Sequence, residues 1–439
     1  MTARSVSTAP LVSLLSLAAL AGTAAGQASY PAIFVANNGN LEGSVTTMRI
    51  ESSGVLTFVD KVVTGTRATT SQPCPGCNTY AIDIAPNGRF LATAHASGNS
   101  TEHLTVYEVA PGGTLTVVEE LPLAQGGLDI NWITNDLLAM PLTDLSQTNQ
   151  VRLFRLDEDN ELTQIDSANS GIFNTSIAVH PNRRWLYAND SFGSTVRVFD
   201  TQGGAISLVQ AQPLPISGVA VAVTPDGRAL FAAGGISAGG NAFAGYAIDP
   251  ADGTLTELPG SPFTSPGESP KGFAFSEDGV FMYVSHGSDA TIHAFALDAS
   301  NIPVSAGFSF DVGSQGSLRE MEGLGGLLIA LDESTSFDGV RGAYSFAINP
   351  GTGNITPLPG SPVDTQGSNP NDVAVWAAQI GCNPADVAFP FNVLDLADLQ
   401  AFVSAFLDGD VLADLAPPVD VYDLADVQTF VASFNAGCP

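Results

Sequence analysis

The chain has 439 residues, of which 14 are basic and 44 acidic, so its formal net charge is −30. Only 13% of the residues are charged whereas 44% are hydrophobic, which is typical of a folded chain with a large core and not of an acidic disordered one. The shortage of lysine and arginine excludes nucleic acids and argues against anionic membrane surfaces as partners. The length predicts one large domain and one small one.

The first 27 residues have the pattern of a secretory signal peptide. Arg4 lies in a short polar leader, an apolar run follows over residues 11–20, and small residues come next. An apolar run of about ten residues is too short to span a bilayer. We therefore expect export, with the mature protein secreted, periplasmic or at the cell surface, and with no membrane span after cleavage.

A repeat of four predicted strands recurs along residues 28–378. Each copy has a short apolar strand, a turn rich in Pro, Asn, Asp and Gly, a second apolar strand, and then two looser strands. The turns lie near residues 86, 134, 181, 225, 277 and 325. A period in the forties built from four strands is typical of a β-propeller.

The two ends of the repeat region complete each other. Residues 371–376 form an innermost strand that has no second strand after it, and residues 32–39 match the second strand of a complete copy. Pairing them would close the ring without leaving edge strands exposed. The sequence thus predicts an all-β fold: a seven-bladed β-propeller closed by a blade shared between the N- and C-terminal strands.

The four cysteines form two pairs along the sequence. Cys74 and Cys77 enclose Pro-Gly in a loop, whereas a thioredoxin-type redox pair opens a helix after a strand. We expect a local structural disulfide between them. Cys382 and Cys438 bracket the last part of the chain and are expected to join, because so small a domain needs more than its core.

The repeat style, the blade length and the shared terminal blade resemble the lactonase-type seven-bladed propellers, over residues 28–378. That group includes bacterial 6-phosphogluconolactonases, fungal carboxymuconate cyclases and their YVTN-repeat relatives. The resemblance implies lactone opening by an Arg, a His and a Glu. In this chain Pro270-Lys271-Gly272 and Ser285-His286-Gly287 stand where the family carries Pro-Arg-His and Asn-Glu, so all three residue types are replaced. A His-x-His-Ser type segment of the family is replaced by Phe173-Asn174-Thr175-Ser176, and an Asp-Leu-Gly type loop keeps its Asp at Asp190.

Lactone hydrolysis needs a general base for water and a cation or donor for the developing oxyanion. The polar residues that remain for these roles are His286, Asp190, Lys271 and Arg319. Each has a structural alternative: His286 could satisfy loop carbonyls, and Asp190 could close a turn through its own side chain. The sequence names His286, Asp190 and Lys271 as catalytic candidates.

Residues 381–439 differ in composition from the rest, with nine Asp and no basic residue, and they form a duplication with an offset of 28 residues. Each half predicts an Asp-rich loop followed by a short amphipathic helix. The pair resembles dockerin-type modules and, more narrowly, the Cys-bracketed tails of exported planctomycete proteins. That resemblance suggests calcium binding by six aspartates, although Asp395 and Asp423 could instead cap the helices. The six are Asp386, Asp395, Asp398, Asp414, Asp423 and Asp426.

Two functions follow from these features. The first is an exported monomeric propeller that binds or displays a protein or carbohydrate ligand, docked or sorted by its C-terminal module. The alternative is a lactonase that opens a sugar lactone, or a related cyclase. The small number of basic residues argues against phosphorylated lactones, because a phosphate needs cationic partners. No cofactor other than calcium is implied.

Overall fold

The computed structural model describes most of the chain from residue 31 to residue 437. The described ranges are 31–96, 102–110, 112–142, 149–234, 240–313, 317–333, 342–376, 383–387, 394, 396–408, 413, 415–416 and 422–437. The predicted signal segment and the Cys382–Cys438 pair lie outside them.

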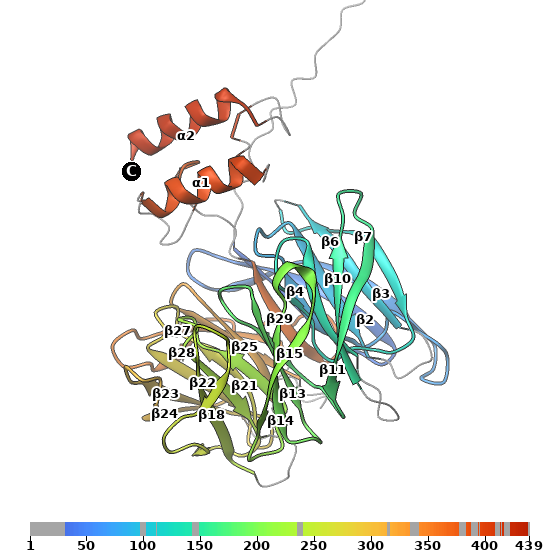
Figure 1. Ribbon diagram of the computed structural model, residues 1–439, viewed down its shortest axis with the longest axis vertical. Coiled ribbons are helices and arrows are strands. Elements are labelled where there is room, and N and C mark those ends of the chain that lie inside the picture. The colour runs from blue at the N-terminus through green and yellow to red at the C-terminus, as the bar shows by residue number, and fades with distance from the viewer. Residues whose placement is uncertain are drawn as a thin grey trace, which may run out of the picture.

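Seven antiparallel sheets surround a central channel and form a seven-bladed β-propeller (Figure 1). The strands of each blade are given from the channel outward. The first blade contains β4 (Thr79–Ile84), β5 (Phe90–His95), β6 (Glu102–Val109) and β7 (Leu115–Leu123). The second contains β8 (Asn131–Trp132), β9 (Leu137–Leu142), β10 (Asn149–Leu156) and β11 (Leu162–Gly171). The third contains β12 (Ile177–Val179), β13 (Trp185–Asp190), β14 (Thr195–Asp200) and β15 (Ser207–Pro213), with the 3₁₀ turn η1 (Gln202–Gly204) before β15.

The remaining blades follow the same plan. The fourth contains β16 (Ala220–Val223), β17 (Ala229–Ala233), β18 (Ala242–Ile248) and β19 (Leu255–Glu257), with β20 (Phe263–Thr264) also on β18. The fifth contains β21 (Pro270–Phe275), β22 (Phe281–His286), β23 (Thr291–Leu297) and β24 (Pro303–Asp311). The sixth contains β25 (Leu318–Leu324), β26 (Leu327–Asp332), β27 (Gly342–Ile348) and β28 (Ile355–Pro357). The closing blade contains β29 (Pro370–Trp376), β1 (Ala32–Asn37), β2 (Glu42–Ile50) and β3 (Leu56–Thr66).

The closing blade confirms the predicted shared blade. Strand β29 is innermost and pairs antiparallel with β1, with Ala32 opposite Trp376. Strand β1 is buried along its whole length because β2 covers its other edge and neighbouring blades cover its faces. Pairing of the two chain ends therefore leaves no open sheet edge at the ring closure.

Apolar side chains from adjacent sheets fill the space between blades. The cluster between the first and second blades joins Leu104 of β6 to Trp132 of β8 and Phe154 of β10, all with at most 1% of their surface exposed. Sheets that pack face to face form such interleaved cores from the inward residues of each strand. The ring thus holds its seven innermost strands at fixed positions around the channel.

Hydrogen bonds from backbone N–H groups to aspartate side chains also link neighbouring innermost strands. Each of three aspartates uses one oxygen for the N–H of its own following residue and the other for an N–H of the next blade. The bonds between blades are accepted by Asp372 from Ile82 at 2.9 Å, by Asp83 from Trp132 at 2.6 Å, and by Asp129 from Ile177 at 2.7 Å. These carboxyl groups therefore have a structural task in the channel wall.

The predicted local disulfide is confirmed, since Cys74 is bonded to Cys77 in the loop between β3 and β4. Among the described residues, no helix is long and apolar enough to cross a membrane.

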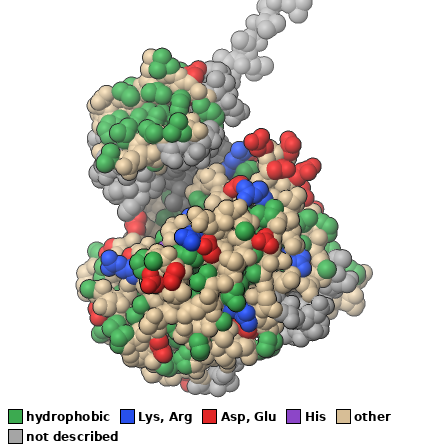
Figure 2. Space-filling model, in the orientation of Figure 1, with side chains coloured by type: hydrophobic (Ala, Val, Ile, Leu, Met, Phe, Trp, Pro, Cys, Tyr) green, Lys and Arg blue, Asp and Glu red, His purple; other side chains and the backbone are tan. Residues whose placement is uncertain are grey.

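The described part of the C-terminal segment contains two helices, α1 (Leu396–Asp408) and α2 (Leu424–Ala436). Phe402 and Phe430 stack between them with ring centroids 4.0 Å apart. Figure 2 shows that apolar side chains also gather on the outer surface of this segment, where Leu407 is 79% exposed. The duplication therefore forms a helix pair, as expected, while the finer assignment to a dockerin-type module stays a prediction.

Three described aspartates of the segment, Asp398, Asp423 and Asp426, hold backbone N–H groups. Asp423 caps α2 by accepting from Ala425, in a capping box with Asp426. Asp426 accepts from Leu415, Ala416 and Asp423, and Asp398 accepts from Val387. No three His, Cys, Asp or Glu side chains come together as metal ligands within the described ranges. The described residues thus fit the capping alternative better than a calcium site; Asp395 and Asp414 lie outside the description, and calcium binding stays a prediction.

Candidate active site

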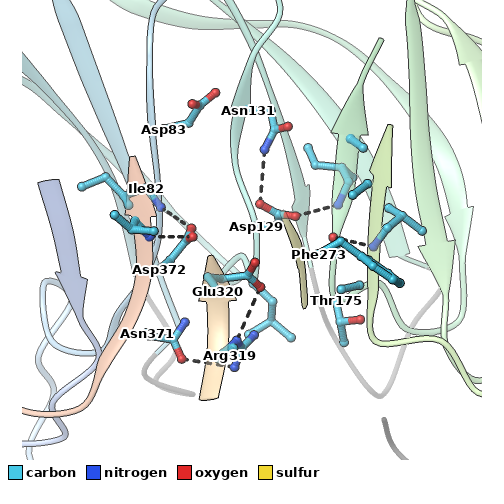
Figure 3. Close-up of a pocket in the computed structure, with 18 of the residues that line it drawn as sticks. Ile82, Asp83, Asp129, Asn131, Thr175, Phe273, Arg319, Glu320, Asn371 and Asp372 are labelled. Atoms are coloured by element: carbon cyan, nitrogen blue, oxygen red, sulfur yellow. Dashed lines mark hydrogen bonds and ion pairs between the residues drawn. The ribbon is translucent and has the colours of Figure 1, made fainter. Parts of the chain in front are cut away.

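A cavity of about 210 Å³ lies in the central channel and is lined by residues of all seven innermost strands or the turns that enter them (Figure 3). Its wall combines polar groups from the first, sixth and closing blades with apolar groups such as Val221 and Phe273 from the fourth and fifth. Among the described residues that line it, Arg319 is the only basic one. The cavity is therefore small, and the described part of its wall holds five acidic residues and one basic residue.

Four consecutive innermost strands place a polar side chain at one mouth of this channel through a β-bulge. The pairing register shifts at Tyr80 in β4, at Lys271 in β21, at Arg319 in β25 and at Asn371 in β29. A bulge inserts an extra residue into one strand and turns its side chain away from the regular alternation. The fifth, sixth, closing and first blades thus present four polar groups to the same mouth.

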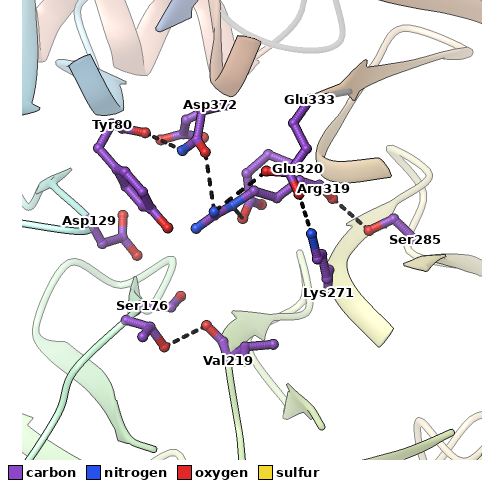
Figure 4. A network of polar contacts seen from close by, with 12 residues as sticks. Tyr80, Asp129, Ser176, Val219, Lys271, Ser285, Arg319, Glu320, Glu333 and Asp372 are labelled. Atoms are coloured by element: carbon purple, nitrogen blue, oxygen red, sulfur yellow. Dashed lines mark hydrogen bonds and ion pairs between the residues drawn. The ribbon is translucent and has the colours of Figure 1, made fainter. Parts of the chain in front are cut away.

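Arg319 is the centre of the polar network at this mouth (Figure 4). Its Nη1 donates to Asn371 Oδ1 at 3.1 Å, and its guanidinium lies 4.5 Å from the centre of the Tyr80 ring. Two carboxylates flank it, with Glu333 Oε2 at 3.8 Å from Nη1 and Glu320 Oε1 at 3.9 Å from Nε. The guanidinium is thus fixed on one side and open to the cavity on the other.

Lys271 belongs to the same network through Glu333, with which it forms an ion pair. Ser317 donates to Glu333 at 3.0 Å, and the Ser285 hydroxyl donates to the backbone oxygen of Arg319. Only 15% of the Glu333 side chain is exposed. Glu333 therefore serves as the anchor that positions both cations at the mouth.

The two glutamates beside Arg319 have opposite electrostatic environments. Burial raises the pKa of Glu320 to about 8, with a further rise from Asp372 that Arg319 only partly offsets. Burial also pushes the pKa of Glu333 upward, but the charges of Arg319 and Lys271 lower it overall. Glu333 is thus an ionised partner, whereas Glu320 is a carboxyl group that exchanges its proton near neutral pH.

The channel wall holds four more carboxyl groups with raised pKa values. Burial raises the pKa of Asp83 and Asp129 to about 7, and burial together with neighbouring carboxylates raises that of Asp372 and Glu322 to about 8. Glu322 is exposed, but it lines the cavity, so its exposed surface faces the narrow channel and not bulk solvent. With Glu320, five carboxyl groups therefore share one small polar space.

His286, named from the sequence as a catalytic candidate, lies inside the fifth blade. It has no exposed surface and does not line the cavity. Its Nδ1 lies 3.1 Å from the carbonyl of Thr291, so Nδ1 carries the proton and Nε2 accepts from Ser265 Oγ at 2.7 Å. Burial lowers its pKa to about 4. This placement fits the structural alternative, a histidine that satisfies loop groups.

Asp190 also matches its structural alternative. Its Oδ1 accepts from the backbone N–H groups of Ile172, Phe173 and Gly193, at 2.9, 3.2 and 2.9 Å. The side chain is 2% exposed and is not part of the cavity wall. Asp190 therefore closes a turn in the third blade, apart from the channel network.

The packing of the fifth and sixth blades leaves no room for a side chain at position 272. A Cβ atom at Gly272 would lie 2.5 Å from the backbone oxygen of Arg319 and 3.1 Å from Ser285 Oγ. Strands β21 and β25 thus approach too closely at this point for any side chain. The close approach brings Lys271 to the sixth blade, where its partner Glu333 lies.

Of the sequence candidates, the structure brings Lys271 and Arg319 together and leaves His286 and Asp190 elsewhere. It adds Tyr80, Glu320, Glu333 and Asn371, which the sequence reasoning missed. A signal existed for Tyr80 and Asn371, because they occupy, like Lys271 and Arg319, the second position of an innermost strand. Comparing equivalent positions across repeats, and not only residue types within one repeat, would have found it.

The fold and this site define a seven-bladed propeller with a polar pocket in its channel. Residues 25–315 match the family described as "Lactonase, 7-bladed beta-propeller", so the chain belongs to that family.

The 6-phosphogluconolactonase of Erwinia tasmaniensis is 28% identical over 172 residues, and that of Klebsiella pneumoniae strain 342 is 30% identical over 175 residues. Each alignment covers 36% of this chain and 50% of the relative, so the match spans about half the length of these curated relatives.

Solved structures share the fold at low sequence identity. The periplasmic gluconolactonase of Pseudomonas aeruginosa has a TM-score of 0.62 at 17% identity, over 80% of this chain and 100% of that one. A putative 6-phosphogluconolactonase from Bacteroides uniformis has a TM-score of 0.61 at 15% identity, over 79% of this chain and 100% of that one.

Proposed function

We propose that this protein is a lactonase that hydrolyses a sugar lactone in the central channel. The observation that carries the proposal is the juxtaposition, at one mouth of the cavity, of Arg319 with the proton-exchanging carboxyl group of Glu320. Hydrolysis of a cyclic ester needs a base and an oxyanion partner side by side. The lactonase family and its 6-phosphogluconolactonase relatives support the same reaction class.

In the reaction, ionised Glu320 takes a proton from a water molecule while the water oxygen bonds to the lactone carbonyl carbon. The negative charge that develops on the carbonyl oxygen is stabilised by Arg319 and by the hydroxyl of Tyr80, which Figure 4 shows pointing into the space beside the guanidinium. When the tetrahedral intermediate collapses, the ring C–O bond breaks and Glu320 returns its proton to the leaving oxygen. The product is an open hydroxy acid.

Glu333 and Lys271 act as positioning residues. They do not line the cavity, but Glu333 contacts both Arg319 and Lys271. This pairing holds Arg319 in place before substrate binds, so the oxyanion partner needs little reorganisation during the reaction.

We propose an unphosphorylated lactone as the substrate. The cavity of about 210 Å³ suits a single sugar ring, and five carboxyl groups share its wall with one arginine. A phosphate would need further cationic partners, and the described residues that line this cavity include none. The Pseudomonas aeruginosa relative, a periplasmic gluconolactonase by name, supports both this substrate class and an exported location for the chain.

The display function favoured by the sequence has less support. The family and its relatives are named for lactone chemistry, which supports hydrolysis, whereas neither the family match nor the curated relatives support docking or display. We therefore propose the lactonase alternative in its place.

The test is hydrolysis of gluconolactone and 6-phosphogluconolactone by the full chain, followed as acid release and corrected for the uncatalysed rate. We expect faster turnover of gluconolactone, and a loss of about 10²–10⁴-fold in kcat for Glu320→Gln. The matched control is Glu108→Gln, because Glu108 is 45% exposed and forms only a surface ion pair. His286→Ala tests the original candidate and should keep its activity if it folds. Equal rates for Glu320→Gln and wild type would refute the proposal.

A further inference from the structure

A second cavity lies at the opposite end of the innermost strands from Arg319, between the second and third blades. Its volume is about 600 Å³, and it is lined by the turn from β8 to β9, the turn from β12 to β13, and the segment around η1. Buried Ile133 and Leu137 contribute apolar surface, while Asn182 and Gln202 contribute exposed side-chain amides. We call this cavity the lower groove.

The lower groove concentrates positive charge in a protein that has little of it. Three of the chain's 14 basic residues, Arg155, Arg183 and Arg184, line it. Asp136 pairs with Arg155 and Asp200 pairs with Arg184, so the groove keeps an excess of one guanidinium group. The rest of the molecule is strongly acidic, so this local excess of guanidinium groups does not follow from composition. An anionic group is the natural ligand for such a set of forked donors.

Arg183 occupies a backbone position that other blades give to glycine. The turn between the first and second strands has a residue with positive φ, which is Gly88, Gly227 and Gly279 in the first, fourth and fifth blades, with φ near 70°. In the third blade the same position is Arg183, with φ 61°. A left-handed conformation costs a residue with a side chain about 1–2 kcal/mol. The backbone of the third blade is thus strained at Arg183, the residue whose side chain lines the groove.

The guanidinium of Arg183 is available to a ligand. Its Nη1 donates to the carbonyl of Trp132 at 3.3 Å, the residue is exposed, and no carboxylate forms an ion pair with it within the described residues. Its charge also acts on Asp83: burial raises the pKa of that carboxyl, and Arg183 opposes the rise. Arg183 therefore lies near both the lower groove and the end of the channel that is opposite Arg319.

The other two arginines are held in place by their surroundings. Arg184 binds Asp200 through two nitrogens, at 2.6 and 3.1 Å, and lies 4.1 Å from the centre of the Trp185 ring. Arg155 contacts Asp136 at 2.7 Å, and a Cβ atom at Gly204 would lie 2.6 Å from its Nη2. Their orientation is thus fixed in advance, which lowers the entropy that a ligand must overcome on binding.

We propose that the lower groove is a binding site for a small sugar that carries an oxyanion, either a carboxylate or a phosphate, distinct from the catalytic channel. The arginines engage the oxyanion, and the amides of Asn182 and Gln202 engage the sugar hydroxyls. The net charge of −30 selects against large polyanions, because they would be repelled by the rest of the surface. The proposal does not depend on hydrolysis in the channel.

Isothermal calorimetry on the full chain tests it with four ligands: glucuronate, glucose 6-phosphate, glucose and inorganic phosphate. We expect at least one sugar anion to bind with a stoichiometry of one, and about tenfold or more tightly than either glucose or inorganic phosphate. The preferred sugar anion identifies the oxyanion. Equal affinity for glucose, or for inorganic phosphate, overturns the proposal.

Three variants locate the binding. Arg183→Gly restores the residue used at this turn by other blades, so it should fold and should lose about tenfold in affinity. Arg228→Gln is the matched control, because it lies just after the equivalent glycine of the fourth blade and is 72% exposed. Arg319→Gln removes the channel cation and should leave the affinity unchanged. Undiminished binding by Arg183→Gly, or loss of binding in Arg319→Gln, contradicts a site in the lower groove.

Discussion

The two ends of the propeller channel use arginine in contrasting ways. At one mouth a β-bulge turns Arg319 into a network of carboxylates, where only 19% of its side chain is exposed. At the other end a left-handed turn residue, Arg183, is exposed and has no carboxylate ion pair within the described part of the chain. The regular blade provides the frame, and each departure from its repeat supplies a polar group. Both departures place an arginine beside a cavity, and both cavities are the sites of our proposals.

The largest difference in kcat between the two ends should come from truncating the Arg319 side chain. Arg319→Ala removes the oxyanion partner, so we expect kcat for gluconolactone to fall by about 10²–10³-fold. Arg183→Gly should leave kcat unchanged, because that residue lies at the other end of the strands. Steady-state kinetics on both variants, with circular dichroism to confirm folding, separates the two ends. A similar loss in both variants would show that they serve one site.

The pH dependence of hydrolysis should reflect the ionisation of Glu320 at the mouth of the cavity. Glu320 acts as a base only when ionised, and its pKa is raised to about 8. The rate should therefore rise with pH, fall about tenfold per pH unit below 8, and level off above it. Binding of a sugar anion to the lower groove should not follow this curve. A rate that is flat between pH 6 and 9, after subtraction of the uncatalysed rate, would exclude Glu320 as the base.

The close approach of β21 and β25 should be sensitive to a single methyl group. Gly272→Ala forces a contact with the backbone oxygen of Arg319, so we expect a loss of about 1–3 kcal/mol in the free energy of unfolding and a lower kcat. Gly351→Ala is the control, because its nearest neighbour would be a side-chain oxygen at 3.5 Å. Urea denaturation and kinetics measure both effects. Wild-type stability in Gly272→Ala would mean that the strands lie further apart.

The smallest effect should be on stability at the lower groove. Arg183→Gly relieves a left-handed backbone but gives up one hydrogen bond to Trp132, and these contributions are of similar size. We expect the free energy of unfolding to change by less than about 1 kcal/mol. A much larger loss in thermal or urea unfolding would assign Arg183 a structural role and weaken the contrast between the two ends.

The sequence predicted the architecture well and the site only in part. The turns and alternating strands identified the blades, and the unmatched strand at residues 371–376 identified the shared blade, because both signals are local. Lys271 was found because it stands where the resembled family carries an arginine, and Arg319 was named among the remaining polar residues. Glu320 and Tyr80 were missed, because their importance depends on which strands are neighbours around the ring. His286 was overvalued, because a strand end does not reveal whether a side chain faces the channel or the inside of its blade.

The sequence by itself determined the seven-fold repeat, the closure of the ring, the local Cys74–Cys77 disulfide and the overall acidity. Turn chemistry and strand periodicity act over a few residues and can be read directly. Only the tertiary structure decided which polar groups share a space. Bulges on four consecutive blades bring Arg319 and three other polar side chains to one mouth. A turn in the third blade brings Arg183 to the other end. Those groups are distant along the chain and meet only because the blades pack in a ring.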